Sequence, residues 1–502
     1  MDPHPPSLGQ PGLPPPPFTS VADEVAWGRG WLEVIGEPPS HLGGEGPLLV
    51  RERQIHAGRH RSVGAVPLLP TMQHVKAAQY ARAGGPWDVP PLDEALARPT
   101  VRVVDGDRRL SGDALHEAID AVVDWLASTG LEPGGVVSWQ LPNGLESYLL
   151  YRACWRYGAV AAAGSDGSAI TTSASTCASE AWTSARPAER WTAAAWPGAV
   201  ELVPGDRGWP PKAAPVGTVA GPGPSDLAAV VFTSGSSGQP KAVMHTHRAL
   251  VCKAREMIEV HELTPTDVVL MPAPLAHVSG LQNGVWVPGA AGMGTVLMAR
   301  WDPALAVDLI ERERVTFMVG PPTFFIGIVE APGFSAERVA SLRLVSSGGS
   351  GVTPAFVESA SAALGARVKR TYGSTESPTT TTSGPDDPVE RDRSTDGRPM
   401  GEMELRITDP ASGDEVPSGV VGEIWVRGPE VFEGYVDRAA TEAAFAPGGW
   451  FRTGDLGFVD ADGWLTITGR IKDIIIRGGE NISAAEVEAA LEAHPAISQA
   501  VA

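Results

Sequence analysis

The stretch Val230–Val243, which reads VVFTSGSSGQPKAV, decides the fold class of this chain. An apolar strand runs into a loop of glycine and hydroxyl residues, and Lys241 follows before the next helix. Glycines let backbone N–H groups converge on an anion, hydroxyls add donors, and a lysine adds positive charge. The stretch therefore predicts a strand that ends at a loop suited to a triphosphate. It differs from a Walker A loop, which needs Gly-Lys-Ser/Thr at fixed spacing, and the alternative interpretation is a flexible Ser/Gly linker.

On both sides of this stretch, apolar strands alternate with amphipathic helices. Leu115, Ile119 and Leu126 mark one face of a helix that ends at Gly130. Another helix begins at Asp302-Pro303, with aspartate as its cap and proline in its first turn. This alternation predicts a mainly parallel α/β sheet. The expected strands are Val101–Asp105, Val136–Leu141, Leu227–Phe232, Val268–Met271, Val315–Val319, Leu342–Ser346 and Val368–Tyr372.

From Met403 onward the pattern changes to short strands separated by turns. The expected strands are Gly422–Arg427, Phe458–Asp460 and Trp464–Thr468, and Asp462-Gly463 forms the turn between the last two. A β-rich subdomain is therefore expected after the alternating region.

Three segments depart from these patterns. Residues 1–72 are rich in proline and glycine and lack a periodic apolar pattern, so we expect a disordered leader; the alternative is a true start further downstream. Residues 164–197 are rich in Ala, Ser and Thr, and they are either a long loop or a product of a shifted reading frame. Residues 470–502 are too few for a free-standing domain and end within an apolar strand, so a truncated domain is expected there. The large domain would then span residues 73–469.

Composition and charge narrow the class of protein. The chain has 502 residues, and 43% of them are hydrophobic, which is enough for a large core. Its 39 basic and 59 acidic side chains give a net charge of −20, which opposes binding to nucleic acids or anionic membranes. Cys154, Cys177 and Cys252 form no spaced pair, so we expect no disulfide framework, no zinc site and a cytoplasmic location. The uncharged stretch Val278–Ala299 contains glycines and a proline and is expected to be buried core rather than a membrane span.

The stretch Val230–Val243 closely resembles a signature of the adenylate-forming superfamily, which includes acyl-CoA synthetases, peptide-synthetase adenylation domains and luciferases. Further segments resemble motifs of that family in the same order, over roughly residues 78–502. The resemblance implies an α/β fold: a large N-terminal domain of mixed and parallel sheets with helices plus a β-rich subdomain, followed by the start of a small α+β C-terminal lid. The matching segments are Leu344–Ser350, Lys369–Glu376 (KRTYGSTE), Gly422–Tyr435 (GEIWVRGPEVFEGY), Trp450–Asp455 (WFRTGD) and Gly469–Glu488 (GRIKDIIIRGGENISAAEVE).

The resemblance also implies roles for individual residues in binding ATP. Tyr372 would stack on adenine, Thr375 would contact the α-phosphate, and Glu376 would hold Mg²⁺. Asp455 would accept hydrogen bonds from the ribose hydroxyls, and Arg470 would meet ribose or phosphate. The remaining contacts to nucleotide and coenzyme A would come from Thr233, Ser234, Gly235, Ser236, Ser237, Gly238, Lys241, Gly348, Gly349, Gly373, Lys472 as the hinge, Gly478 and Gly479.

The implied activity is that of an AMP-forming acid–thiol ligase. ATP would activate an organic carboxylic acid as an acyl-adenylate, with Mg²⁺ offsetting charge at the phosphates, and coenzyme A would then accept the acyl group. An amino-acid-activating domain is one alternative, although Val278, Gly280 and Thr379–Thr382 offer no fixed charge for an amino group. A remnant that binds nucleotide and acyl-adenylate with little turnover is another, because the family's lid lysine has no counterpart in this sequence.

Several weaker signals have competing interpretations. His277, in Pro274–Gly280 (PLAHVSG), resembles the family's gate between the acyl and ATP pockets, with Gly280 beside it; the alternative is an ordinary buried polar residue. His245 and His247 lie two residues apart without a further metal ligand nearby, so we expect a role at the entry to a helix. The acidic residues Asp386, Asp387, Glu390 and Asp392 predict a solvated loop.

Overall fold

The computed structural model describes residues 88–164, 221–233 and 241–473 in full, and four further strands through their backbone. Those strands are β1 (Gln54–Ala57), β6 (Val200–Glu201), β22 (Ile474–Arg477) and β23 (Glu480–Ser483). Val487 and Leu491 are described as single positions. All of these residues belong to one compact unit, Arg51–Ala502. The unusual segment 164–197 lies outside the described residues, apart from Gly164.

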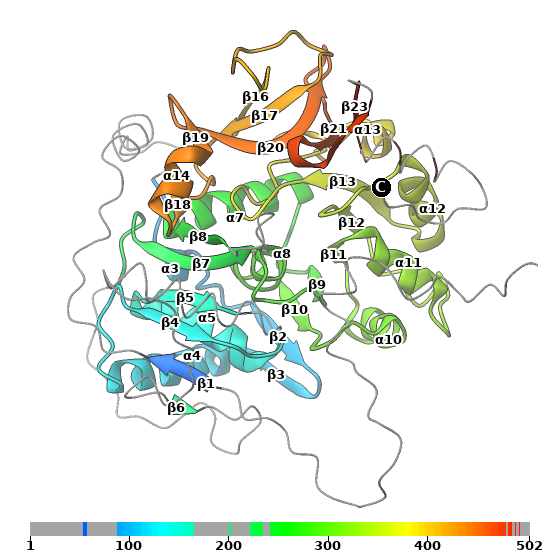
Figure 1. The fold of residues 1–502 in the computed structure, drawn as a ribbon. Helices are drawn as coiled ribbons and strands as arrows, with labels where there is room; N and C mark the ends of the chain where they lie inside the picture. The colour runs from blue at the N-terminus through cyan, green and yellow to red at the C-terminus, as the bar shows by residue number, and fades with distance from the viewer. Residues whose placement is uncertain are drawn as a thin grey trace, which may run out of the picture. The chain divides into compact units, whose positions relative to one another are not determined.

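Two large sheets form the body of this unit, and each is parallel in its centre and antiparallel at its edges (Figure 1). The first is seven-stranded, and β7 pairs in parallel with β5 and antiparallel with β8. The hairpin β7–β8 is where the sequence predicted a strand followed by an anion-binding loop. In spatial order the strands are β18 (Gly434–Tyr435), β8 (Lys241–Thr246), β7 (Leu227–Thr233), β5 (Val160–Ala163), β4 (Val136–Trp139), β1 and β6.

The second sheet is nine-stranded and contains the longest parallel run. Its central strands are almost continuously apolar and buried, as expected for parallel strands covered on both faces. The order is β15 (Arg398–Pro399), β14 (Thr381–Thr382), β13 (Arg367–Tyr372), β12 (Leu344–Ser347), β11 (Phe317–Gly320), β9 (Val268–Met271), β10 (Gly294–Leu297), β2 (Arg102–Asp105) and β3 (Arg108–Ser111). The predicted mainly parallel α/β arrangement is confirmed for these central strands.

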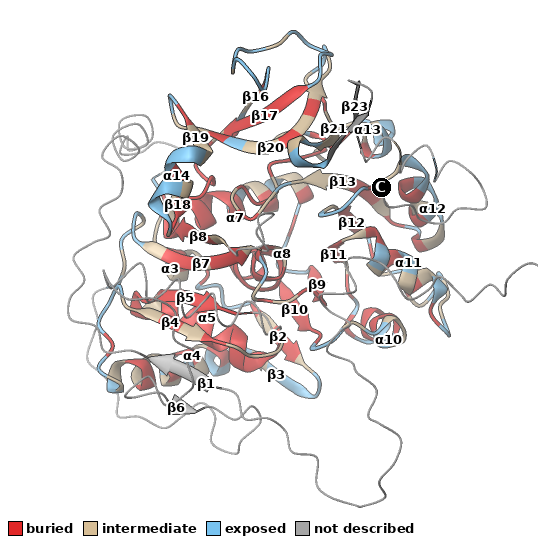
Figure 2. Cartoon of the chain, in the orientation of Figure 1, coloured by how far each residue is buried: buried red, intermediate tan, exposed pale blue. Residues whose placement is uncertain are grey.

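Helices cover the sheets, and their ends follow the capping signals in the sequence. In α10, Asp302 accepts a hydrogen bond from the Leu305 N–H at 3.0 Å, and Pro303 occupies the first turn. In Figure 2, α5 is buried along almost its whole length, whereas α14 is mostly exposed. The helices are α3 (Leu92–Ala95), α4 (Gly112–Ser128), α5 (Leu145–Tyr157), α7 (His247–His261), α8 (Val278–Leu281), the π-helix η3 (Gln282–Trp286), α9 (Val287–Ala291), α10 (Pro303–Glu313), α11 (Pro322–Glu330), α12 (Pro354–Leu364), α13 (Val389–Ser394) and α14 (Arg438–Ala444).

The expected β-rich subdomain is a five-stranded antiparallel sheet followed by the β22–β23 hairpin. One strand differs from the prediction. Instead of a short strand at Phe458–Asp460, a ten-residue strand, β20, runs from Trp450 to Val459 and includes the WFRTGD segment. It can be this long because it pairs with strands on both of its sides. It pairs directly with β17 (Gly422–Arg427), β19 (Phe445–Ala446) and β21 (Leu465–Arg470). Strand β17 pairs in turn with β16 (Glu404–Thr408).

The uncharged stretch 278–299 is buried core, as expected. It forms α8, η3, α9 and β10, and Trp286 and Met293 within it are fully buried. In the part of the chain described here, no helix is both long enough and apolar enough to cross a membrane.

The amino-terminal segment departs from the sequence prediction at one place. Strand β1 lies within residues 1–72, where a disordered leader was expected, and it pairs antiparallel with both β4 and β6. Backbone hydrogen bonds to an existing sheet can form without the periodic apolar pattern that the prediction relied on. The rest of residues 1–72 lies outside the described residues.

Candidate active site

Tyr372, at the end of β13, is connected to Asp455 and Arg470 from the β-rich sheet. The Tyr372 hydroxyl donates to Asp455 Oδ2 at 2.8 Å, and Arg470 Nε lies 2.7 Å from Asp455 Oδ1. Asp455 and Arg470 face each other in the β20–β21 register. Asp455 is only 4% exposed, and burial raises its pKa against the opposing effect of Arg470. Its two carboxylate oxygens are therefore held by two different side chains.

Glu376, four residues after Tyr372, is connected to Tyr435 and Lys241. The Tyr435 hydroxyl donates to Glu376 Oε1 at 2.7 Å, and Lys241 Nζ lies 4.5 Å from the centre of the Tyr435 ring. Burial and the charge of Glu376 raise the pKa of Tyr435, so the phenol stays protonated and remains a donor. The cation of Lys241 and the carboxylate of Glu376 thus both contact one tyrosine.

His245 fixes the backbone between these two groups. Its Nε2 lies 2.8 Å from the carbonyl oxygen of Thr375, and because a carbonyl only accepts, Nε2 carries the proton. His245 belongs to strand β8, so the expected role at a helix entry falls to His247, the first residue of α7. Within the described residues, no three His, Cys, Asp or Glu side chains come together as a metal site.

Thr233 and Lys241 face each other in the register of the β7–β8 hairpin. Residues 234–240, which join them, include the predicted contacts Ser234, Gly235, Ser236, Ser237 and Gly238 and lie outside the described residues. The hairpin register nevertheless places both ends of that loop next to each other, at the end of β7 and the start of β8.

Two glycines allow the backbone to approach closely in this region. A Cβ at Gly348, directly after β12, would lie 2.3 Å from the carbonyl oxygen of Thr371. A Cβ at Gly373 would lie 2.3 Å from the backbone nitrogen of Thr379. Such contacts are far shorter than packing allows, so both positions require glycine. Gly349 has a positive φ of 83°.

A buried cluster of charged side chains contacts the backbone at Thr379, shortly after Glu376. Lys253 Nζ contacts Glu256 at 2.8 Å, Glu430 at 3.1 Å and the carbonyl oxygen of Thr379 at 2.9 Å. Burial alone would lower the pKa of Lys253, but the two glutamates raise it. Thr379 has a φ of 47°, which is unusual for a β-branched residue and indicates strain held by its surroundings. Gln282 adds a hydrogen bond to Thr379 Oγ1 at 2.9 Å.

His277 caps helix α8, where its Nδ1 accepts a hydrogen bond from the Ser279 N–H at 3.2 Å. Solvent reaches the imidazole, so it is not the buried polar residue of the alternative interpretation, although desolvation still lowers its pKa. A Cβ at Gly280 would lie 1.9 Å from the carbonyl oxygen of Pro274, so only glycine fits there. Because α8 continues into η3, this turn is joined to Thr379 through Gln282.

The structure thus places five of the predicted site residues in two groups and leaves others outside its described part. Tyr372, Asp455 and Arg470 form one group, and Glu376 and Lys241 form another around Tyr435. Lys472 lies exposed in a short 3₁₀ turn, Ile471–Asp473, directly after Arg470. Gly478 and Gly479 lie outside the described residues.

Tyr435 was not predicted as a functional residue. It ends the segment Gly422–Tyr435, which the sequence identified only as a motif. Its contact with Glu376 spans 59 positions of the chain, and no local pattern encodes it.

With this geometry established, the chain can be compared with known proteins. The model of the AMP-binding enzyme family matches residues 92–436, well over half of the chain. The chain therefore belongs to the AMP-binding enzyme family.

Sequence relatives and solved structures agree with this membership. The chain is 39% identical over 276 residues to a medium-chain fatty-acid–CoA ligase of Escherichia coli (strain K12), covering 55% of this chain and 48% of the relative. It is 36% identical over 278 residues to an indoleacetate–CoA ligase of Aromatoleum aromaticum, covering 55% and 54%. The chain thus spans about half the length of these curated relatives.

Among solved structures, ATP-bound MatB from Rhodopseudomonas palustris has a TM-score of 0.66 at 25% identity, covering 85% of this chain and 84% of that one. O-succinylbenzoate coenzyme A synthetase (MenE) from Bacillus subtilis, in complex with AMP, has a TM-score of 0.67 at 25% identity, covering 82% and 85%. The predicted α/β architecture is confirmed by these likenesses.

Proposed function

We propose that this chain uses ATP to activate an organic carboxylic acid as an acyl-adenylate and then transfers the acyl group to coenzyme A. The observation that carries the proposal is the segment from Tyr372 to Glu376. One of its ends is hydrogen-bonded to the buried carboxylate of Asp455, and the other presents a carboxylate to Tyr435, whose ring Lys241 also contacts. We assign the nucleoside to the first of these ends and the phosphates to the second. The names of the relatives, which are CoA ligases, support the same activity.

The proposed chemistry proceeds in two steps. A carboxylate oxygen attacks the α-phosphorus of ATP, the bond to the bridging oxygen of pyrophosphate breaks, and acyl-adenylate and pyrophosphate result. The sulfur of coenzyme A then attacks the acyl carbon, its proton leaves, and AMP departs with the former carboxylate oxygen. Neither step needs a covalent protein nucleophile, so the protein contributes position and charge.

Individual residues take the roles that their contacts suit. Asp455 accepts from the ribose hydroxyls, and Tyr372, which holds one of its oxygens, borders the adenine. Lys241, Thr233 and Thr375 lie toward the phosphates, with Arg470 adding a second cation near the ribose. We assign Ser234–Gly238, Gly348, Gly349 and Gly373 to the nucleotide, and Lys472, Gly478 and Gly479 to the hinge and the thiol path. His277 and Gly280 border the acyl group.

Among the candidate site residues, Glu376 is suited to bind a magnesium ion. Glu376 supplies hard carboxylate oxygens, one of which is fixed by Tyr435. Magnesium commonly binds one or two carboxylates and takes its other ligands from water and substrate phosphates. Glu376 would hold the ion, whose charge would stabilise the pentacoordinate phosphorus during the first step.

We also propose the domain division and location that the sequence suggested. Residues 73–469 would form the nucleotide-binding domain, and residues 470–502 would belong to a C-terminal lid. Within the described residues, Cys154 and Cys252 are free and buried, and burial raises the pKa of each thiol, which suits a reducing cytoplasm. Medium-chain fatty acids and indoleacetate are the first substrates to examine, because relatives carry those names.

The proposal is tested by acid-dependent exchange of labelled pyrophosphate into ATP. A panel of fatty, aromatic and dicarboxylic acids is compared with the common amino acids, in the presence of Mg²⁺. Exchange with at least one simple carboxylic acid, absent in Glu376→Gln, is expected. Exchange with amino acids alone would replace the proposal by an amino-acid-activating domain. Binding of a non-hydrolysable acyl-adenylate without any exchange would indicate a binding protein.

A further inference from the structure

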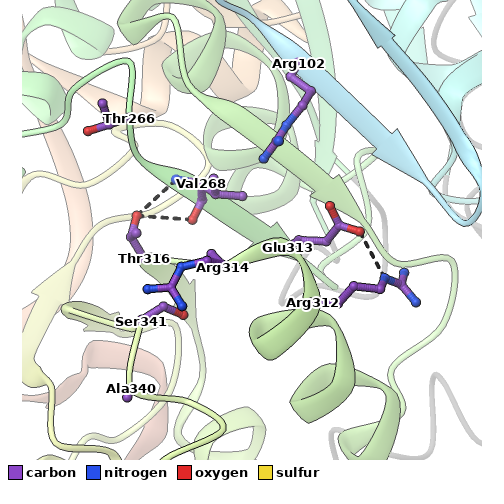
Figure 3. Close-up of a pocket in the computed structure, with 9 residues that line it drawn as sticks. All are labelled: Arg102, Thr266, Val268, Arg312, Glu313, Arg314, Thr316, Ala340 and Ser341. Carbon is purple, nitrogen blue, oxygen red and sulfur yellow. Dashed lines mark hydrogen bonds and ion pairs between the residues drawn. The ribbon is translucent and has the colours of Figure 1, made fainter.

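A cavity of about 550 Å³ lies at the amino ends of the parallel strands in the nine-stranded sheet (Figure 3). Arg102 begins β2, Val268 begins β9, and Thr316 directly precedes β11. The candidate active site lies at the opposite, carboxyl-end edge of the same parallel sheet, because Gly348 follows β12 and Tyr372 ends β13. The cavity is therefore separate from the site that the proposed function uses.

Arg102 reaches into this cavity across a neighbouring strand. In the sheet register Arg102 pairs with Gly294 of β10, and Gly294 pairs with Val268 of β9. A Cβ at Gly294 would lie 3.2 Å from Arg102 Nη2 and 3.4 Å from Nε. The glycine thus leaves room for the guanidinium to lie over β10 and border the cavity beside Val268. Figure 3 shows the Arg102 side chain extending from its strand toward Val268.

The cavity wall is positively charged. Three arginines line it, Arg102, Arg312 and Arg314, against one carboxylate, that of Glu313. Glu313 already accepts from Arg109 at 2.6 Å and from Arg312 at 3.0 Å. Within the described residues, no carboxylate forms an ion pair with Arg102 or Arg314. The excess of positive charge is local, because the chain as a whole carries −20.

The neutral polar groups of the cavity are already used within the protein. Thr316 donates to Asp267 Oδ1 at 2.7 Å, and Arg343 contacts the same carboxylate at 2.9 Å. Ser341 donates to the carbonyl oxygen of Val315 at 2.8 Å. Recognition of a ligand here therefore depends on the guanidinium groups. Their planar donor forks match phosphate and carboxylate oxygens.

We propose that this cavity is an anion-binding site for a phosphate-bearing small molecule, remote from the candidate active site. Its volume lies within the range of ligand pockets, about 300–1,000 Å³, and exceeds what a single phosphate ion fills. Arg102 and Arg314 bind the anion, coming from different elements of the fold, β2 and the end of α10.

The test is calorimetric titration of the full chain with inorganic tripolyphosphate in the absence of divalent cations. Four variants are compared with the wild type: Arg102→Met/Arg314→Met, Arg314→Met alone, Arg438→Met and Lys241→Met. Arg438→Met is the matched control, because Arg438 is exposed and does not line the cavity. It lies in α14 and, among the described residues, pairs only with Glu442. Lys241→Met removes the cation of the candidate active site.

We expect the double variant to weaken at least tenfold the component of tripolyphosphate binding that persists in Lys241→Met, while Arg438→Met and Lys241→Met each retain that component within about twofold of the wild-type value. Arg314 is exposed, so Arg314→Met leaves the fold intact and should weaken binding by itself if the double variant fails to fold. Wild-type affinity in Arg314→Met, loss of all binding in Lys241→Met, or no binding by the wild type would each overturn the proposal.

Discussion

Replacing Tyr435 with phenylalanine tests how the Glu376 carboxylate is held. The substitution removes the hydroxyl that donates to Glu376 Oε1 at 2.7 Å. It keeps the ring, which packs 4.8 Å from the Phe432 ring centre and lies under Lys241. A hydrogen bond to a charged group contributes about 1.5–3 kcal/mol. At 1.36 kcal/mol for each factor of ten, the loss corresponds to a change of about 10- to 150-fold. Because this contact orients the proposed ligand of Mg²⁺, we expect it to appear in magnesium-dependent ATP binding.

The assay is calorimetric titration with ATP, with and without Mg²⁺, on the wild type, Tyr435→Phe, Glu376→Gln and the double variant. Tyr435→Phe should lose affinity mainly in the presence of Mg²⁺. The double variant should bind no more weakly than Glu376→Gln alone, because the hydroxyl would act only through the carboxylate. Additive losses in the double variant, or an equal loss with and without Mg²⁺, would refute the reasoning.

The other predictions concern the nucleotide contacts and one buried histidine. Gly348→Ala should weaken ATP binding more than tenfold, because its methyl group would lie 2.3 Å from a backbone oxygen, whereas Gly351→Ala, with open space around it, should bind normally in the same titration. Asp455→Asn should weaken AMP binding about 10- to 100-fold by calorimetry, since it removes the charge that would accept the ribose hydroxyls. His247 is buried, and burial lowers its pKa to about 4. The contribution of the neutral imidazole to the free energy of unfolding is therefore fully present above pH 6.5, its ordinary pKa, and is lost as the pH falls through 4. Between pH 7 and pH 4, the free energy of unfolding measured with urea should therefore fall by up to about 3 kcal/mol more for the wild type than for His247→Gln. Equal decreases in the two proteins would contradict this.

Much of the fold could be predicted because its signals are local. The apolar strand before Ser234 and the cap at Asp302 need only neighbouring residues to be recognised, and both elements are where the pattern placed them. The candidate site residues were likewise chosen from single motifs. Tyr372, Glu376 and Asp455 were identified from the segments that contain them; in the structure Tyr372 donates to Asp455, and Glu376 accepts from Tyr435 instead.

Features that depend on distant contacts could not be predicted. The acidic run at Asp386–Asp392 was expected to be a solvated loop, but Asp392 is 1% exposed and pairs with Arg367 at 2.7 Å, inside helix α13. The free-energy cost of burying this carboxylate is offset by Arg367, a partner 25 positions away, and composition does not reveal such a pairing. The cluster of Lys253 and Glu430 escaped prediction for the same reason, because 177 positions separate the two residues.

The most direct test of the proposed activity follows an oxygen atom. The chain is mixed with ATP, Mg²⁺, coenzyme A and the acid that supports the fastest pyrophosphate exchange, labelled with ¹⁸O in its carboxylate, and the nucleotide product is analysed by mass spectrometry. Attack of the carboxylate on the α-phosphorus predicts AMP that carries one ¹⁸O atom. Unlabelled AMP, or ADP in place of AMP, would contradict the account.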